Sequence, residues 1–519
     1  MLITQEVLTV DGQLRAAGRD DGDRQALRWE DRTWTYAELE AATARAAVGL
    51  AAAGVGVGDH VALMMRNCPE WLFAWLGAAR SGRPAVAVNA ALKGEGLRYV
   101  LDHSDTVCVV VEDECIDELE AVIDRLPRIR TVVIVGERRL PGAIGWEALN
   151  RSDAGSGEPV PNPGPDDPMM LLYTSGTTGL PKAVVVAQRR CVGPSGLLAA
   201  AGIGEGDVGF TSLPFFHASG SLVAFCGCFG LRVPLAVGRR FSASRHWDEM
   251  RRHGATSFNA LGSIIPILMK QSEEPGDADN PCRLVISAGC PPELWRPFEA
   301  RFGVEVFEWY GMVEGGITVA GPAAPVGSIG KAVGMEARVV RDDGTETEAM
   351  EVGELVFRPL REPASIDYYK NAEAAAAKTA GGWLHSGDRV CRDSDGWLFY
   401  VDRGAHYIRR SGENISSAEI ERVVAAHPAV LECAAYGLPS PLGEDDVAVA
   451  VVARPGASID PDELIGWCRQ RMATFQVPRY LRRVDVLPKT ETQKVQNLVL
   501  RNEGVVTGMF DRQSTTPSP

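Results

Sequence analysis

The stretch "LLYTSGTTGLPKAVVV" (residues 171–186) places four hydroxyl side chains and two glycines, followed by a lysine, between two apolar runs. A loop of small residues leaves its backbone N–H groups uncovered and can wrap closely around phosphate oxygens, while the hydroxyls and Lys182 add donors and positive charge. The stretch is not a Walker loop, because Gly176 is followed at the fifth position by Pro181 rather than by glycine. We therefore expect a phosphate-binding loop of another kind. The alternative is an ordinary strand-turn-strand connection with an incidental lysine.

On the N-terminal side of this stretch, apolar runs of strand length alternate with alanine-rich segments of helical period. Residues 35–54, 70–82 and 97–105 have the helical pattern, and residues 60–67, 83–89 and 107–113 have the strand pattern. This order predicts βαβ units and a largely parallel sheet. The segment "GVGVGDH" (residues 54–60) follows a helix and precedes a strand, the wrong order for a dinucleotide fingerprint, so we expect a turn there.

Two changes of pattern suggest how the chain is divided. Residues 151–167 are rich in Pro, Gly and Asp and predict a surface linker or long loop. After residue 404 the pattern restarts with helices expected at 417–426 and 461–472 and strands at 431–437 and 445–453. We therefore expect an α/β protein with two domains. Residues 1–402 would form a large domain of mixed and parallel sheets flanked by helices, and residues 403–519 a small α+β domain.

Composition and charge limit the possible partners. The chain has 519 residues, 45% of them hydrophobic and 23% charged, and a formal net charge of -15. Such a chain is not expected to bind nucleic acid or an anionic membrane, so a few local cations and Mg²⁺ would have to meet the charge of a nucleotide. The eleven cysteines include no C-x-x-C pair, which indicates free thiols in a reducing compartment rather than a metal framework.

Targeting and membrane signals are not recognisable in the sequence. Residues 1–21 combine no basic region with a long apolar core, so we expect no signal peptide. The most apolar run, residues 222–237, is interrupted by Arg232 and Pro234 and is too short to span a bilayer. We therefore expect a cytoplasmic protein without a transmembrane segment.

Six further blocks follow the opening stretch. They are "SLPFFHASG" (212–220), "SAGCPP" (287–292), "EWYGMVEGG" (308–316), "GGWLHSGDRV" (381–390), "VDRGAHYIRRSGENISSAEIE" (401–421) and "LPKTETQKVQN" (487–497). In this order and spacing the seven blocks resemble the adenylate-forming superfamily, which includes acyl-CoA synthetases, peptide-synthetase adenylation domains and luciferases. The resemblance covers nearly the whole chain. Residues 258–268 and 408–417 look most like the carnitine and crotonobetaine-type CoA ligases.

The resemblance implies a set of ATP-binding residues. Tyr310 matches the aromatic residue that packs on adenine. Asp388 and Arg403 match residues that contact the ribose, and a carboxylate is a suitable acceptor for a diol. The implied ATP-binding residues are Thr174, Ser175, Gly176, Thr177, Thr178, Gly179, Lys182, Gly289, Tyr310, Asp388 and Arg403.

The resemblance also implies the catalytic residues and the order of the reaction. Glu314 matches the glutamate that helps to hold Mg²⁺, and Lys494 matches the lysine that contacts the attacking carboxylate and the α-phosphate. Attack on the α-phosphorus moves negative charge onto the non-bridging oxygens, so a fixed cation and Mg²⁺ suit the transition state. In family members the C-terminal domain then rotates, Lys494 leaves, the "RSGEN" segment enters, and CoA attacks the acyl-adenylate.

An acyl pocket and a CoA path follow from the same resemblance. The residues that match the acyl pocket are Phe216, His217, Ser219 and Leu261, with Gly289 nearby. The aromatic residues Phe216, Phe225 and Trp309 favour an apolar or aromatic acid. Ser411 and Gly412 match positions that border the pantetheine path, and His406 matches the hinge of the rotation.

The chain departs from the family pattern at several of these positions. Ala183 replaces a glycine after the loop lysine, Val313 a threonine before the glutamate, and Gln493 a glycine before the catalytic lysine. Ala405 and His406 stand where the family has lysine and aspartate. A hinge needs only to absorb a change in φ and ψ, so a histidine can serve there.

The resemblance therefore implies an AMP-forming acyl-CoA ligase that uses ATP, Mg²⁺, a small-molecule acid and CoA. The departures leave two alternatives within the superfamily. One is a ligase that loads a carrier protein, and the other is an ATP-dependent diazotase of secondary metabolism that uses nitrite and an aryl amine. A non-catalytic nucleotide-binding relative is a further alternative, against which the retained Lys182, Glu314, Asp388 and Lys494 argue.

Overall fold

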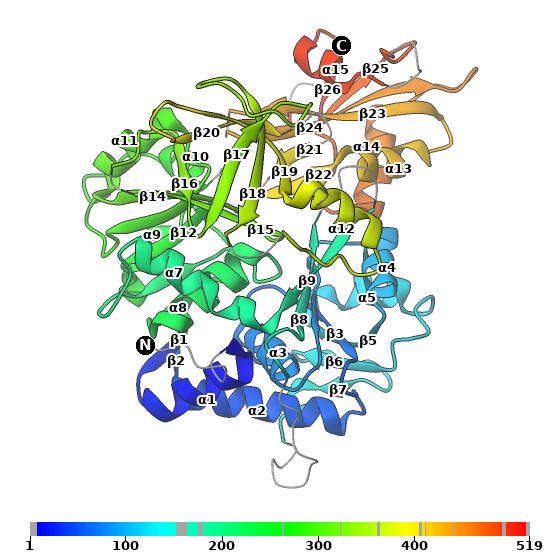
Figure 1. The fold of residues 1–519 in the computed structure, drawn as a ribbon. Helices are drawn as coiled ribbons and strands as arrows, with labels where there is room; N and C mark the ends of the chain where they lie inside the picture. The colour runs from blue at the N-terminus through cyan, green and yellow to red at the C-terminus, as the bar shows by residue number, and fades with distance from the viewer. Residues whose placement is uncertain are drawn as a thin grey trace.

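The structure, a computed structural model, describes residues 8–514 apart from 152–162, 175–179, 262–263, 322, 361–363, 404–406, 411, 442 and 490–494. Within these ranges the strands form a seven-stranded, a thirteen-stranded, a four-stranded and a two-stranded sheet. The two large sheets come from the N-terminal part of the chain, and the two small ones from the C-terminal part, which is orange and red in Figure 1. This arrangement confirms the predicted α/β fold with a large N-terminal and a small C-terminal α+β domain.

The seven-stranded sheet has the order β7-β6-β5-β3-β4-β8-β9 and is parallel except for its last pair. Its strands alternate with helices, which confirms the βαβ units expected from the sequence. Thr35 and Glu38 form a capping box at the start of helix α2, and Gly54 lies just beyond its end with a φ of 79°. The strands are β3 (His60–Met64), β4 (Ala85–Ala87), β5 (Thr106–Glu112), β6 (Thr131–Val135), β7 (Ile144–Gly145), β8 (Pro168–Thr174) and β9 (Lys182–Ala187). The helices are α2 (Tyr36–Ala52), α3 (Pro69–Arg80), α4 (Gly94–His103), η2 (Asp113–Cys115), α5 (Ile116–Ile123) and α6 (Trp146–Leu149).

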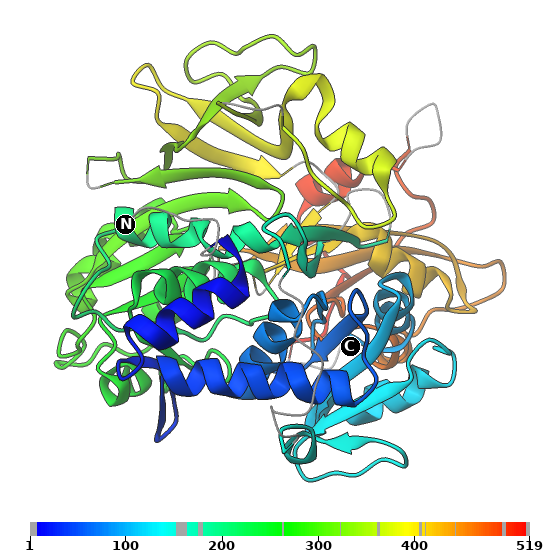
Figure 2. The same cartoon turned by 60° about the horizontal axis from the view of Figure 1, so that its bottom comes forward.

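Helices α2 and α3 pack closely because Gly77 has no side chain. A Cβ atom at Gly77 would lie 2.7 Å from the Cβ of Ala46 and 2.9 Å from the carbonyl oxygen of Thr43. Helix α1 (Val10–Asp20) lies beside α2 (Figure 2), and its Asp11 pairs with the buried Arg80 of α3 at 2.6 Å. Arg80 also pairs with Glu40 of α2 at 2.8 Å. A buried charge without a partner is strongly destabilising, so these ion pairs fix the three helices relative to one another.

The thirteen-stranded sheet has the order β17-β18-β19-β20-β16-β15-β14-β13-β12-β10-β11-β1-β2. It is parallel from β1 to β14 and antiparallel from β14 to β17. Ligands of open α/β sheets bind outside the carboxyl ends of the parallel strands. Three of the sequence blocks lie at the carboxyl ends of these strands. Block 212–220 follows β10, block 287–292 begins at the end of β13, and block 308–316 begins within β14, so the sheet brings the three to one edge.

The elements of this second sheet and its flanking helices complete the N-terminal part. The strands are β1 (Gln25–Trp29), β2 (Arg32–Thr35), β10 (Gly209–Thr211), β11 (Leu235–Val237), β12 (Ser257–Leu261), β13 (Leu284–Ala288), β14 (Glu305–Met312), β15 (Gly315–Ala320), β16 (Ser328–Ala332), β17 (Met335–Val340), β18 (Gly353–Pro359), β19 (Leu384–Arg392) and β20 (Leu398–Arg403). The helices are η3 (Gln188–Cys191), α7 (Gly193–Ala200), the π-helix η4 (Ser219–Cys226), α8 (Gly227–Leu231), α9 (His246–His253), α10 (Ile264–Met269), α11 (Pro292–Phe302), α12 (Ala372–Lys378) and η5 (Ala380–Gly382).

The C-terminal part consists of a hairpin and a four-stranded sheet with three helices. Ile408 and Ile415 of the hairpin pack into the same core as Leu464, so the hairpin belongs to this part. The hairpin is β21 (Tyr407–Arg410) and β22 (Glu413–Ser416), and the sheet is β23 (Val430–Pro439), β24 (Asp445–Ala453), β25 (Tyr480–Arg483) and β26 (Phe510–Asp511). The helices are α13 (Ser417–Ala425), α14 (Pro461–Arg471) and α15 (Asn497–Glu503). The two helices and two strands expected here from the sequence are all present. The domain boundary expected between residues 402 and 403 stays a prediction.

Across the described ranges, every helix is too short or too polar to traverse a lipid bilayer.

Candidate active site

The phosphate end of the site is built on the β8–β9 hairpin. Thr174 pairs with Lys182 in the strand register, so the two strands bring together the ends of the predicted loop, whose residues 175–179 lie outside the described part. The ammonium group of Lys182 lies 5.6 Å from the ring centre of Tyr368. The Tyr368 hydroxyl donates a hydrogen bond to Glu314 Oε1 at 2.7 Å. Tyr368 therefore links two residues that the sequence assigned to the phosphate groups and to Mg²⁺.

Arg190, from η3, adds a second cation beside Glu314. Its guanidinium donates to the carbonyl oxygen of Val313 at 2.9 Å. Burial lowers the pKa of Arg190 from its ordinary value, and the charge of Glu314 opposes this effect. An arginine stays charged under such a shift, so Lys182 and Arg190 both contribute positive charge to this end of the site.

Glu314 has the chemistry expected of a Mg²⁺ ligand. Mg²⁺ prefers oxygen ligands and commonly takes one or two protein carboxylates together with phosphate oxygens of the substrate. In the described part of the chain there is no cluster of three or more His, Cys, Asp and Glu side chains that could hold a metal by themselves. One Glu314 oxygen accepts from Tyr368, and the carboxylate as a whole fits an ion shared with a triphosphate.

The adenosine end of the site brings together Tyr310 on β14 and Asp388 on β19. Asp388 is only 3% exposed, and its Oδ2 accepts a hydrogen bond from the Tyr310 hydroxyl at 2.5 Å. Ser386 Oγ accepts from the Asp388 backbone N–H at 3.0 Å, which fixes the start of this strand segment. Arg403 pairs with Asp388 in the strand register, and its side chain lies outside the described part. The backbones of two predicted ribose residues therefore lie opposite each other on neighbouring strands.

Glu308, two residues before Tyr310, is a buried carboxylate that sequence reasoning missed. It is 2% exposed and accepts hydrogen bonds from the backbone N–H groups of Gly289 and Cys290. Gly289, predicted as an ATP-binding residue, has a φ of 95°, a left-handed backbone that suits glycine. The sequence block around residue 289 is thus held by a side chain of the neighbouring strand.

Residues predicted for the acyl pocket lie beside the β21–β22 hairpin, and His217 is one of them. Its Nε2 lies 2.6 Å from Glu413 Oε1 in the C-terminal hairpin, and Asn89 Nδ2 donates to the same oxygen at 3.0 Å. Burial by itself would lower the pKa of His217, but the charge and hydrogen bond of Glu413 raise it above its ordinary value. A Cβ atom on Gly412 would lie 3.5 Å from Leu261. The hairpin therefore reaches the residues predicted to line the acyl pocket.

The aromatic residues expected near the acid differ in position. Phe216 is partly buried, and its ring centre lies 4.7 Å from that of His217. Phe225 and Trp309 belong to the main hydrophobic core, at 3% and 9% exposure, and Phe225 packs against Trp75. Ser219, the remaining pocket residue, begins the π-helix η4. Of the three aromatic residues, Phe216 is therefore the one with exposed surface beside the predicted pocket.

Several predicted residues cannot be placed. Residues 175–179 of the phosphate loop, the hinge at 406, residue 411 of the CoA path and the catalytic Lys494 lie outside the described part. Their roles stay predictions from the family resemblance.

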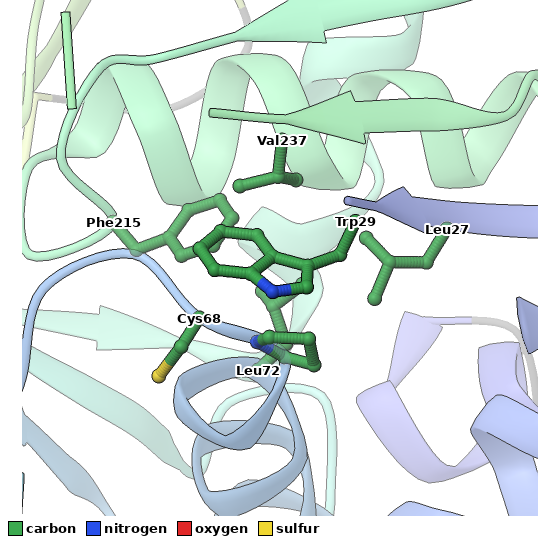
Figure 3. A pocket seen from close by; sticks show the side chains of 7 residues that line it. Leu27, Trp29, Cys68, Leu72, Phe215 and Val237 are labelled. Carbon is green, nitrogen blue, oxygen red and sulfur yellow. The ribbon is translucent and has the colours of Figure 1, made fainter. Parts of the chain in front are cut away.

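Two cavities lie away from these residues. In the first, Trp29, Phe215 and Val237 come together with other apolar side chains and leave no room for a water molecule (Figure 3). The second, of about 700 Å³, opens beside Glu112 and Glu114. None of the described residues predicted for the site lines either cavity.

Known proteins match this chain over most of its length. A family model described as AMP-binding enzyme matches residues 14–359, and one described as AMP-binding enzyme C-terminal domain matches residues 419–494. A sulfoacetate–CoA ligase of Cupriavidus necator is 33% identical over 92% of this chain and 96% of its own length. A crotonobetaine/carnitine–CoA ligase of Salmonella typhimurium is 29% identical over 91% of this chain and 95% of its own length. A solved o-succinylbenzoate CoA synthetase of Bacillus subtilis has a TM-score of 0.78 and 26% identity, and the match covers 94% of this chain and 98% of that one.

Proposed function

Because the chain belongs to the AMP-binding enzyme family, we propose how its residues perform the reaction of an AMP-forming acyl-CoA ligase. In the first half-reaction a carboxylate oxygen attacks the α-phosphorus of ATP, and the bond to pyrophosphate breaks. In the second, the sulfur of CoA attacks the acyl carbon of the adenylate, the bond to AMP breaks, and the thiol proton leaves to solvent. The products are an acyl-CoA thioester, AMP and pyrophosphate.

The observation that carries the use of CoA is the position of the β21–β22 hairpin. Glu413 reaches His217 and Asn89 of the N-terminal part, and Gly412 lies beside Leu261. This is the segment that the resemblance assigns to the second half-reaction, when CoA approaches the acyl carbon. A C-terminal segment seated at the acyl pocket supports an acceptor step after adenylation.

In the first half-reaction the cations at the phosphate end would stabilise the developing charge. Lys182 lies near the ring of Tyr368 and Arg190 near Glu314, and both would bind phosphate oxygens. A bound Mg²⁺ would supply further positive charge to the same oxygens. Asp388 would accept hydrogen bonds from the ribose, while Tyr310 holds that carboxylate in place. Lys494 would enter when residues 403–519 rotate as a unit about the hinge at His406.

The acid is proposed to be a monocarboxylate with an apolar or aromatic chain. Phe216 and Leu261 give the predicted pocket an apolar character, and the charge of His217 is already paired with Glu413. A second anionic group, such as the sulfonate of sulfoacetate, would need an unpaired cation. Among the described residues predicted for the pocket, His217 is the only one with a titratable side chain.

The cytoplasmic location expected from the sequence is retained as part of this proposal. All eleven cysteines are free thiols, ten of them buried and Cys433 partly so. Free thiols of this number are typical of a reducing compartment.

A substrate panel tests the proposed function. Pyrophosphate release would be measured with ATP, Mg²⁺ and a series of aliphatic, aromatic and sulfonated acids, each with and without CoA. Acyl-CoA formed from an apolar or aromatic acid is the expected result. Thioester formation that is best with sulfoacetate would contradict the substrate class. Pyrophosphate release that needs nitrite and an aminobenzoate but no CoA would instead identify a diazotase.

Replacement of Glu413 by glutamine should slow the thioester step. The change removes the charge that holds His217 and Asn89, and a hydrogen bond to a charged group contributes about 1.5–3 kcal/mol, so we expect a loss of at least about tenfold in the rate of thioester formation. Adenylate formation should change little, because the family resemblance assigns the hairpin to the domain orientation of the second half-reaction and not to that of the first. Single-turnover assays of each step would measure both rates.

Glu463→Gln is the matched control for this variant. Glu463 lies on the same domain with a side chain that is 70% exposed, away from the hairpin. Equal damage to both half-reactions in Glu413→Gln would mean that Glu413 is structural. Equal rates in the variant and the control would show that the contact with His217 has no part in the acceptor step.

A further inference from the structure

A buried carboxylate supports the backbone that follows strand β13. Glu308 on β14 accepts a hydrogen bond from the N–H of Gly289 through Oε1, and its two oxygens lie 3.3 Å and 3.2 Å from the backbone nitrogen of Cys290. Helix α11 begins at Pro292, so these two residues form the connection between strand and helix. The strand pairing of β13 with β14 ends at Ser287 and Glu308. Beyond it, the side chain of Glu308 accepts the hydrogen bonds of the Gly289 and Cys290 backbone.

The same strand carries Tyr310, a residue predicted for the nucleotide site. Glu308 lies two residues from Tyr310, whose hydroxyl donates to Asp388. Side chains two residues apart on a strand point to the same face of the sheet, so Glu308 and Tyr310 lie on one face of β14. The connection at Gly289 and the Tyr310–Asp388 pair are thus held by one short stretch of strand.

We infer that Glu308 is a positioning residue of the nucleotide site: it holds the Gly289–Cys290 backbone in the conformation that receives ATP. This inference rests on the ATP-dependent function proposed above. It assigns a role to a side chain that does not touch the nucleotide itself.

The ionisation of Glu308 controls the strength of this support. Burial raises the pKa of Glu308 to about 7, against the opposing effects of hydrogen bonds from Gly289, Ser287 and Cys290 and of the positive charge of Arg409. An ionised carboxylate accepts more strongly than a carboxylic acid, whose O–H faces groups that are themselves donors. The backbone is therefore held most firmly above neutral pH.

The charged and titratable groups around Glu308 come from three elements. Cys290 lies in the connection itself, and burial beside Glu308 raises its pKa, so the thiol stays neutral. Glu293 and Glu299 on α11 face Cys290 and add negative charge. Arg409 on β21 is the cation that faces Glu308, and it belongs to the hairpin that also carries Glu413.

The position of Arg409 couples Glu308 to the orientation of the C-terminal domain. In the structure described here Arg409 favours the ionised form of Glu308. If the domain rotates, this cation leaves, and Glu308 takes up a proton more readily. The nucleotide connection is then held less firmly in the orientation that lacks Arg409.

Calorimetric titration with ATP and Mg²⁺ between pH 6 and pH 8.5 tests the inference in Glu308→Gln. In the wild type we expect the affinity for ATP to rise as pH increases through about 7. The variant should bind ATP about tenfold more weakly at the upper end, since a hydrogen bond to a charged group is lost. The affinity of the variant for ATP should also no longer rise as the pH increases. If Glu308 had a purely structural role, the variant would keep this rise.

Glu299→Gln is the matched control. Glu299 also accepts a backbone N–H, that of Val306 at 3.0 Å, but this N–H belongs to β14 and not to the Gly289–Cys290 connection. This variant should keep the pH dependence of the wild type. Thermal unfolding of both variants would establish that each is folded before its titration is compared.

The outcomes separate this inference from the proposed function. A wild-type protein that does not bind ATP would contradict the proposed function. ATP binding by the wild type with an unchanged affinity and pH profile in Glu308→Gln would overturn the inference alone. Arg409→Gln should move the midpoint of the profile to higher pH, and an unmoved midpoint would overturn the coupling to domain orientation.

Discussion

Lys494→Ala should lower the rate of acyl-adenylate formation by about 10²–10³, the scale expected when one preorganised electrostatic stabiliser is removed. The family resemblance assigns Lys494 to the attacking carboxylate and the α-phosphate, where negative charge develops during the first half-reaction. Lys494 stands in the block "LPKTETQKVQN" (residues 487–497) of the C-terminal domain. Rapid-quench measurement of adenylate formation under single-turnover conditions would give the rate.

The same variant provides its own control through the second half-reaction. Supplied with a chemically synthesised acyl-adenylate and CoA, Lys494→Ala should still release AMP and thioester at nearly the wild-type rate. The reason is that the family resemblance assigns that step to the hairpin with Glu413, which contacts His217. Lys489→Ala is the matched control variant. It removes another lysine of the same block, one whose ammonium group pairs with Glu432 at 2.8 Å.

Two outcomes would contradict this assignment. Equal damage to both steps would mean that Lys494 is structural or that the domain does not alternate between two orientations. Undiminished rates in both steps would mean that Gln493, where the family has glycine, marks the loss of the motif.

Asp388→Ala should weaken the binding of ATP by about 10- to 150-fold, the equivalent of one charge-assisted hydrogen bond of about 1.5–3 kcal/mol. Asp388 is 3% exposed, so the ribose hydroxyls would be left without an acceptor in a place that water fills poorly. The Tyr310 hydroxyl would lose its partner as well. Isothermal titration calorimetry with ATP would measure the change, and the KM of the acid should be affected less.

Two further variants identify the source of the effect. Asp342→Ala removes a carboxylate of the same region that is 94% exposed, and it should leave ATP binding unchanged. Tyr310→Phe removes the hydroxyl that donates to Asp388 but keeps the ring. An affinity for ATP in Asp388→Ala equal to that of the wild type would remove Asp388 from the nucleotide site. A loss in Tyr310→Phe as large as that in Asp388→Ala would mean that Asp388 acts by holding the tyrosine.

The sequence predicted the fold because most of its signals are local. The alternation of helical and strand periods in residues 35–113 corresponds to α2, β3, α3, β4, α4 and β5 in the structure. Capping and turn signals act within a few residues, as Thr35, Glu38 and Gly54 do at the ends of α2. The order of the blocks then identified the family, and the family models confirm that identification.

Burial was the property that the sequence predicted least well. Phe225 and Trp309 were interpreted, with Phe216, as favouring an apolar or aromatic acid, and both lie in the main core. An aromatic side chain has the same composition whether it lines a pocket or fills a core, so its role depends on what packs around it. Phe225 meets Trp75 from α3, which no local pattern indicates.

The sequence by itself determined which chemistry-bearing residues this protein has and the strands and helices that carry them. The tertiary structure decided which of them meet. Glu413 contacts Asn89 across 324 residues and His217 across 196, and Tyr368 reaches Glu314 across 54. Such contacts depend on how sheets and domains pack, and neither periodicity nor spacing along the chain indicates which distant residues will be in contact. Glu308 shows the same principle at short range: two adjacent parallel strands bring its carboxylate to the Gly289 backbone, and that burial raises the pKa of Glu308 to about 7.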